Sequence, residues 1–167
     1  INFYPWVLVL AVPSCVVGHD SFEISRAFGA EVGERLHELL EEYSEQKVSD
    51  ALGRLRARAD RMMRDHLIAL PDGTISVEDY LDNDGVNDVP LKLAIDMTIK
   101  NDKLTLDFSR SSPACAGPVN ISRATTIAAV YVALKHLFTD VPANAGVLQP
   151  VEFIIPQGSF LNVRAPK

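Results

Sequence analysis

The sequence has few residues of the kinds that bind metals or form disulfides. Among its 167 residues there are only two cysteines, Cys15 and Cys115, far apart in the chain. Its four histidines stand singly, with no HxH, HxxxH or HExxH spacing. Because zinc sites and disulfide frameworks need several suitably spaced ligands, we expect neither a local metal site nor a disulfide. Reduced thiols in a cytoplasmic protein are the expected state.

Motifs for nucleotide binding and for a seryl nucleophile are also missing. No GxxxxGK[ST] phosphate loop and no GxSxG nucleophile elbow occurs in the chain. We therefore expect this chain to bind no ATP by itself, and no catalytic residue can be assigned.

Positive charge is in short supply. There are 16 Lys and Arg against 22 Asp and Glu, which gives a net charge of −6. Nucleic-acid phosphates are contacted mainly by Lys and Arg, so a nucleic-acid partner is not expected. The densest basic run, between Arg54 and Arg64, is interleaved with apolar residues and is interpreted as the solvated face of a helix.

Long hydrophobic runs are limited to residues 3–18. This run is shorter than the roughly 20 residues of a membrane span and contains Pro5 and Pro13, so no membrane partner is expected. No Lys or Arg precedes it and no clear cleavage site follows it, which disfavours a secretory signal. We treat residues 1–20 as a separate apolar segment, either a buried strand with partners upstream or the product of a misread gene boundary.

Residues 21–68 are predicted to form a helical hairpin. In its first half, apolar residues recur every three or four positions, which gathers on one helix face Phe28, Val32, Leu36, Leu39, Leu40 and Tyr43. Ser44 stands at the break and is positioned to cap a second helix. The inward side chains of that helix are expected to be Val48, Leu52, Leu55, Ala59, Met62 and Met63.

The hydrophobic period then changes to two, which predicts strands at 75–81, 91–99 and 104–108. Asn101-Asp102 suits a tight hairpin turn between the last two strands. These strands are expected to form an antiparallel meander with one buried face. A third helix follows Ser122, apolar enough to be buried on more than one side, and then a further strand at 151–155. The predicted fold class is α+β, with the helical hairpin at 21–68 and a β/α part at 70–167.

Two kinds of loop are candidates for binding. Residues 82–88 contain three carboxylates and two amides, a composition that can bind calcium, although the spacing is not that of an EF-hand. A polar hairpin connection explains the same residues equally well. Three further loops, at 117–120, 142–146 and 156–162, are rich in Asn, Gly and Pro. Asparagine amides donate and accept hydrogen bonds and can orient a substrate, yet these residue types also simply make turns.

Four ordered motifs make the second part of the chain recognisable. They are ED-LD-DG in the first hairpin, DFS-SSP---GP-N after the third strand, P-NAG---P, and P-GS-LN-R-P near the end. In this pattern, strong from about Leu70 to Lys167, the sequence closely resembles the hydantoinase B/oxoprolinase family.

The resemblance implies a partial domain of a B-type subunit, as in ATP-dependent N-methylhydantoinase and 5-oxoprolinase. Such a subunit acts with an A-type ATP-binding partner on a small cyclic amide such as a hydantoin or 5-oxoproline, where phosphorylation of the amide oxygen would supply a leaving group. ATP and a divalent metal are implied for the complete enzyme, with the metal ligands in an upstream segment that this fragment lacks. The residues that the resemblance places in substrate binding are Asp107, Ser109, Asn120, Asn144 and Asn162.

Three alternatives remain beside this interpretation. Relatives of the family carboxylate ketones such as acetone or acetophenone, so the chain could belong to a ketone carboxylase. It could instead be a non-catalytic segment that forms a scaffold or an interface between subunits, or a small calcium-binding module.

Arg110 departs from the family pattern, which usually has glycine in a DFSG turn. A residue with a Cβ atom at positive φ would cost roughly 1 kcal/mol or more. We therefore expect either a different turn or a damaged loop in a truncated or decaying gene.

Overall fold

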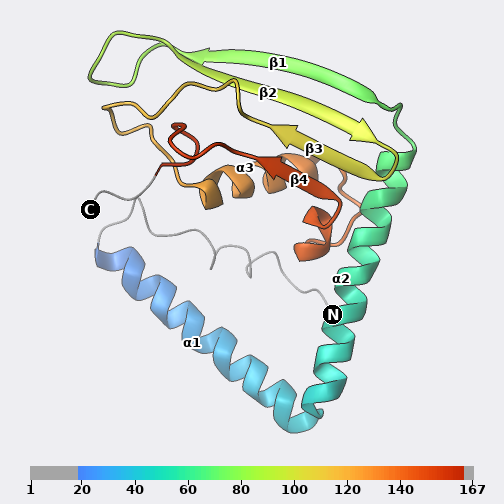
Figure 1. Ribbon diagram of the computed structural model, residues 1–167. Coiled ribbons are helices and arrows are strands. Elements are labelled where there is room, and N and C mark those ends of the chain that lie inside the picture. The colour runs from blue at the N-terminus through green and yellow to red at the C-terminus, as the bar shows by residue number, and fades with distance from the viewer. Residues whose placement is uncertain (1–18, 164–167) are drawn as a thin grey trace.

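The computed structural model describes residues 19–163, with side chains described from residue 29 onward. Residues 1–18 of the expected apolar segment lie outside this part of the chain, as does the side chain of Phe28. Two long helices are followed by a four-stranded sheet and a third helix that precedes the last strand (Figure 1). The predicted α+β class is confirmed.

The helical hairpin consists of α1 (His19–Glu42) and α2 (Glu45–Ile68). Ser44 occupies the N-cap position of α2, but its side chain makes no capping hydrogen bond. None of the helices within residues 19–163 is long and apolar enough to cross a membrane.

Only the second half of α2 is buried as predicted. Of the side chains predicted to point inward, Ala59 and Met63 are buried, whereas Leu52 and Leu55 are exposed. Leu67, which was not predicted, is buried as well. The reason is visible in Figure 1, where α2 meets the sheet at its C-terminal end and its first half projects beyond it. On α1 the expected apolar face is likewise largely uncovered, with Leu36, Leu40 and Tyr43 exposed.

The sheet has the strand order β1-β2-β3-β4, formed by β1 (Gly73–Leu81), β2 (Leu91–Lys100), β3 (Lys103–Asp107) and β4 (Val151–Ile154). The first three strands are antiparallel, which confirms the predicted meander. β4 is parallel to β3, and α3 (Arg123–Leu137) lies in the connection between them. Asn101, in the two-residue turn between paired Lys100 and Lys103, has a φ of 55°.

The strand register gives the sheet one apolar and one polar face. Ile75 pairs with Met97, and Met97 pairs with Leu106, so these side chains share a face. On β3 this face is buried in a core with α2 and α3 that includes Met63, Leu67, Leu104, Leu106, Phe108, Tyr131 and Leu134.

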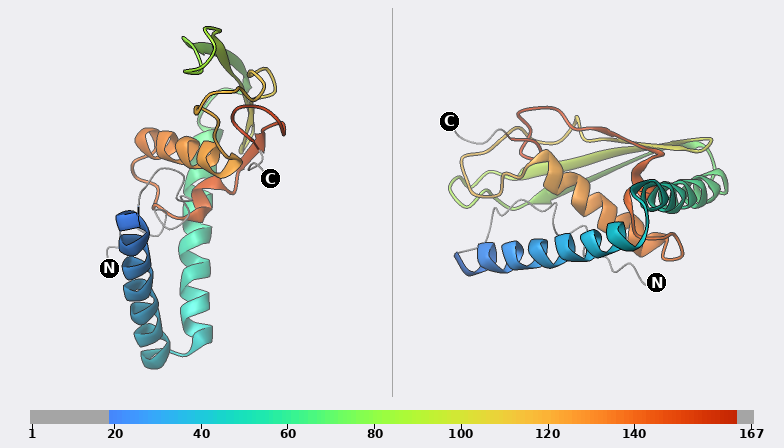
Figure 2. Two further views of the ribbon diagram at one scale, coloured as in Figure 1. Left: turned by 90° about the vertical axis from the view of Figure 1, so that its left-hand side faces the viewer. Right: turned by 90° about the horizontal axis from the view of Figure 1, so that it is seen from below.

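The prediction of one buried face is wrong for β1, where every residue is exposed. Ile75 is 58% exposed and Val77 is 55% exposed. In Figures 1 and 2, α3 lies beneath the β3–β4 side of the sheet and leaves β1 uncovered.

The prediction that the third helix is buried on several sides is also wrong. Its buried residues are Thr126, Tyr131 and Leu134, while Val132 and Leu137 are exposed. The helix therefore buries one face against the sheet despite its apolar composition. Its predicted cap is confirmed, because the Ser122 hydroxyl accepts a hydrogen bond from the backbone N–H of Thr125 at 3.2 Å.

The difference in burial along α2 yields a stability prediction. Leu67→Ala, at a residue 1% exposed, is expected to reduce the free energy of unfolding by about 2–5 kcal/mol because it leaves a cavity in the core. The matched control is Leu52→Ala, at 48% exposure on the same helix, expected to change it by no more than about 0.5 kcal/mol. Urea unfolding measures both, and equal losses would contradict the assigned core.

Candidate functional site

The candidate site lies where β3 and β4 end, in two loops that pair with each other. The backbone N–H of Ala114 donates to the carbonyl of Gly158 at 2.7 Å, and the backbone N–H of Ile121 donates to the carbonyl of Phe160 at 2.7 Å. Residues 109–121 and 156–163 are thereby held as one layer. Because β3 and β4 are parallel, their carboxyl ends meet at this edge.

Asp107 and Ser109 stand at the end of β3. One carboxylate oxygen of Asp107 accepts the backbone N–H of Ser109 at 2.8 Å. Asp107 pairs across the sheet with Asp96, which places it on the polar face. Asp107 is half-buried and Ser109 is exposed, so both side chains reach solvent.

Asn120 and Asn162 lie in the loop pair, but their amides serve the loops themselves. Asn120 accepts the backbone N–H of Cys115 at 3.0 Å and donates to the carbonyls of Cys115 and Gly117 at 2.7 and 3.1 Å. Asn162 donates to the carbonyl of Ile155 at 2.8 Å. Each amide closes its own loop.

Asn144 is not brought together with the other four predicted residues. It precedes the short 3-10 helix η2 (Ala145–Leu148), ahead of β4, where its side chain accepts from Gly146 N–H at 2.8 Å and donates to the carbonyl of Leu55 on α2 at 3.2 Å. A Cβ atom on Gly146 would lie 2.1 Å from the carbonyl oxygen of Arg56, so η2 docks on α2 at a distance that only glycine permits. A role in substrate binding stays a prediction for all five residues.

Asp84 connects two loops, a role that the sequence alone did not indicate. We call it the Asp84 anchor. It is 3% exposed, and its carboxylate accepts the backbone N–H groups of Val86, Asn87 and Gly117 at 2.9, 2.6 and 3.1 Å. These bonds, from Asn87 first, lower the pKa of Asp84 to about 2. The carboxylate thus ties the β1–β2 connection to the loop of Asn120.

The surroundings of Asp84 favour the hairpin interpretation of residues 82–88 over a calcium site. Both carboxylate oxygens of Asp84 accept hydrogen bonds from backbone N–H groups. A calcium site is instead surrounded by oxygen ligands. A Cβ atom on Gly117 would lie 1.6 Å from the carbonyl oxygen of Asp84, so the two loops meet backbone to backbone. Within residues 19–163 there is no cluster of three His, Cys, Asp or Glu able to hold a metal ion.

Arg110 corrects the expectation of a damaged loop. It is not among the residues with positive φ. Its guanidinium donates to both carboxylate oxygens of Asp96, at 2.8 and 2.7 Å, and to Glu78. Arg110, with a further hydrogen bond from Ser76, lowers the pKa of Asp96 to about 2. The turn does not need positive φ at Arg110, and this arginine joins β1, β2 and the loop after β3.

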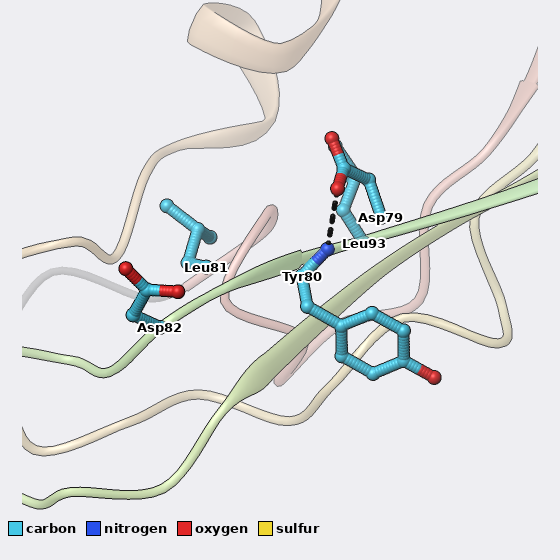
Figure 3. Close-up of a pocket in the computed structure, with 5 residues that line it drawn as sticks. All are labelled: Asp79, Tyr80, Leu81, Asp82 and Leu93. Atoms are coloured by element: carbon cyan, nitrogen blue, oxygen red, sulfur yellow. Dashed lines mark hydrogen bonds between the residues drawn. The ribbon is translucent and has the colours of Figure 1, made fainter.

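A surface depression lies elsewhere, at the end of β1 (Figure 3). Its lining consists of Asp79, Tyr80, Leu81, Asp82 and Leu93. Figure 3 shows the ring of Tyr80 on the opposite side of the strand from Asp79 and Leu81. None of the five predicted site residues lines it.

Three glycine N–H groups in the loops of residues 83–162 already have hydrogen-bond partners. The N–H groups of Gly85 and Gly117 donate to Asn83 and Asp84 side chains, and that of Gly158 donates to the carbonyl of Asn162. Free amides of this kind bind the phosphates of a nucleotide, and these three glycines offer none.

The sequence profile described as Hydantoinase B/oxoprolinase matches residues 27–167. The chain belongs to this family. It is 32% identical, over 96% of its length, to the putative B-type subunit of a D-/L-hydantoinase from Pseudomonas sp. (strain NS671), of which it covers 29%.

Two solved structures share the fold. An ATP-dependent caprolactamase from Pseudomonas jessenii matches with a TM-score of 0.74 and 27% identity, over 96% of this chain and 28% of that chain. A nucleotide-free acetone carboxylase matches with a TM-score of 0.63 and 18% identity, over 77% of this chain and 19% of that chain. The hydantoinase B/oxoprolinase chain described here thus spans less than a third of each of these three relatives.

The hydrogen bonds of the Asp84 carboxylate predict how folding stability changes at acid pH. Because folding holds the pKa of Asp84 near 2, below its ordinary value of 3.8, its contribution to stability is present above about pH 4 and is lost as the pH falls toward 2. Asp84→Asn should weaken this acid response and lower the urea midpoint at neutral pH, because an amide N–H₂ would face N–H donors. Asp82→Asn, at an exposed position of the same loop, should leave both quantities unchanged. Identical pH profiles for the three proteins would contradict the anchor.

The ion pairs of Arg110 with Asp96 and Glu78 predict a contribution to folding stability that depends on salt concentration. Arg110→Ala is expected to lower the urea midpoint at low ionic strength, and the difference should shrink at about 1 M salt, where the screening length falls to about 3 Å. Arg61→Ala, at an exposed position on α2, serves as the control, and its urea midpoint should equal that of the unmodified protein at both salt concentrations. A loss independent of salt would mean that Arg110 acts through packing alone.

Proposed function

We propose that this chain is part of the B-type subunit of an ATP-dependent enzyme that hydrolyses the C–N bond of a small cyclic amide, such as a hydantoin or 5-oxoproline. An A-type subunit supplies the ATP-binding site in this proposal. The observation that carries it is the likeness, over 96% of the chain, both to a hydantoinase subunit and to an ATP-dependent caprolactamase.

The chemistry common to these relatives supports a cyclic amide. Hydantoin and caprolactam are both rings closed by an amide bond, whose carbonyl carbon reacts poorly with water because nitrogen is a poor leaving group. An enzyme for either ring needs an activated amide and groups that orient it. The loop layer after β3 and β4 offers a rigid support for such orientation.

Asp107 and Ser109 are the residues that we assign to the substrate. The side chain of Asp107 lies on the polar side of the sheet, and both residues reach solvent just after β3. A carboxylate and a hydroxyl there can accept from the ring N–H and donate to a ring carbonyl, respectively. Asn120 and Asn162 act one step away, by fixing the loops.

A divalent metal and ATP belong to other parts of the enzyme in this proposal. The described residues contain no cluster that could hold the metal, and the N–H groups of Gly85, Gly117 and Gly158 are not free to bind phosphates. Both groups would therefore act from outside residues 19–163.

The ketone-carboxylase alternative has weaker support. The match to acetone carboxylase, at 18% identity, concerns the fold alone. A purely structural segment is the other alternative, and the internal use of the three Asn amides is compatible with it.

A chimaera tests the function. In it this chain replaces the matching part of the Pseudomonas jessenii caprolactamase chain, and the purified complex is assayed for ATP-coupled opening of caprolactam, hydantoin and 5-oxoproline. Ring opening of at least one amide is expected. A folded complex that opens none of them but carboxylates acetone or acetophenone would favour the carboxylase, and one without either activity would favour the structural segment.

Single substitutions in the chimaera separate binding from support. Asp107→Ala and Ser109→Ala are expected to lower kcat/KM roughly 10-fold or more with an unchanged unfolding midpoint. Asn144→Ala, at the opposite end of β4, is the comparison variant: it should cost about 0.5–1.5 kcal/mol of stability through the loss of its hydrogen bonds to the Leu55 carbonyl and from the Gly146 N–H, and an unchanged kcat/KM per folded molecule would remove Asn144 from the substrate site. Unchanged turnover in both the Asp107 and Ser109 variants would remove them from the site.

A further inference from the structure

An apolar side chain lies beside Asp107 on the polar face of the sheet. Ile154 of β4 is the register partner of Asp107 on β3, so the two side chains point to the same side. Ile154 is 40% exposed, whereas Val151 and Phe153 of the same strand pack against the core. A ligand bound by the Asp107 carboxylate would therefore also meet an open hydrocarbon surface.

Two carboxylates near Asp107 are offset by cations. Asp96, the register partner of Asp107 on β2, binds Arg110 through both of its oxygens, at 2.8 and 2.7 Å. Glu78 of β1 accepts a further hydrogen bond from Arg110 and lies 3.7 Å from the ammonium nitrogen of Lys92. Two cations thus face two carboxylates, and these four groups together carry no net charge.

Asp107 itself and a further carboxylate, Glu152, are held by neutral hydrogen-bond donors. Asp107 accepts the backbone N–H of Ser109 at 2.8 Å, and Glu152 accepts the hydroxyl of Thr105 at 3.3 Å. Thr105 lies two residues before Asp107 on β3 and is the register partner of Glu152, so both carboxylates share one face. The surface around Asp107 and Ile154 therefore has an excess of negative charge.

Two lysines on the same face lie too far away to restore the balance. Lys100 and Lys103 are register partners beside the turn between β2 and β3. Lys103 precedes Asp107 by four residues, which places it roughly 13 Å away along the strand at about 3.3 Å per residue. That distance exceeds the screening length of about 8 Å at physiological salt, so these lysines do little to offset the charge at Asp107.

We propose that the site at Asp107 takes an uncharged cyclic amide in preference to a ring that carries a carboxylate. This inference rests on the proposed function and narrows it: a lactam or hydantoin ring without an ionised substituent fits, and 5-oxoproline does not. The Asp107 carboxylate accepts the ring N–H, and Ile154 packs against the carbon atoms of the ring. The carboxylate of 5-oxoproline would meet the negative charge of Asp107 and Glu152, while the two nearby cations are already paired.

One pair of compounds isolates the charge. 5-Oxoproline and its carboxamide share the same lactam ring and differ by one negative charge. Both are measured as competitive inhibitors of the ring opening that the chimaera catalyses. The inhibition constant of the acid is expected to be at least about 5-fold higher than that of the carboxamide, because two carboxylates near the ligand repel it by an interaction of this order. This acid-to-amide ratio should fall between about 0.05 M and about 0.5 M salt, as screening increases.

Substitutions of Ile154 place the effect at this site. Ile154→Arg is expected to lower the acid-to-amide ratio at least about 5-fold, because a cation there would pair with the ligand's carboxylate or offset that of Asp107. Ile154→Met, uncharged at the same position, can change both inhibition constants but should leave their ratio unchanged. Val132→Arg, at 50% exposure against 40% for Ile154, adds the same charge on α3, which packs against the apolar face, and should also leave the ratio unchanged.

The outcomes separate this inference from the function on which it rests. A chimaera that opens no cyclic amide overturns both. A chimaera that opens one but binds the acid as tightly as the carboxamide overturns the preference for an uncharged ring alone, as does one that binds neither compound. A ratio that does not respond to salt has the same consequence and needs no variant. A ratio that Ile154→Arg leaves unchanged, or that Val132→Arg lowers equally, would place the repulsion away from Asp107 and overturn the inference as well.

Discussion

The loops of this protein depend on one constraint, the need of irregular backbone for hydrogen-bond partners. Outside helices and sheets, N–H and C=O groups must be satisfied by side chains, by other loops or by water. Here a few short polar side chains do so: Asp84 collects three N–H groups, and Asn120 binds both ends of its own loop. The loops after β3 and β4 add direct backbone bonds between them. Substrate binding at this edge would rest on that rigidity.

The same constraint explains why the most tempting candidate residues have structural duties. An asparagine amide has two donors and two acceptor lone pairs, so an amide that donates twice and accepts twice has no capacity left for a ligand. Asn120 is in this state. Asn144 donates once and accepts once, and Asn162 donates to Ile155. The side chains at the end of β3 remain open to a solute. The proposed function therefore places the substrate near Asp107 and Ser109.

Sequence periodicity predicted the elements well because each depends on local pattern. The alternation in β2 and β3, the turn at Asn101 and the cap at Ser122 are confirmed. Burial was predicted less well because it depends on what covers a face. β1 has the same alternation as β2, yet α3 does not reach it, and Val77 is left exposed. Nor could pattern alone give the parallel pairing of β4, which requires the path of the chain around α3.

Arg110 shows that a residue with a side chain fits, without positive φ, at a position where the family pattern usually has glycine. A glycine at that position would suggest positive φ, but the arginine avoids it and bridges two acidic residues on neighbouring strands. The change costs nothing in backbone strain, and it orders the polar face beside Asp107. No sequence rule would have paired Arg110 with Glu78, because the contact needs the register of β1 on β2 and the direction of the loop after β3. The polar face beside the candidate site is thus fixed by the same strand pairing that leaves the opposite, apolar face of β1 uncovered.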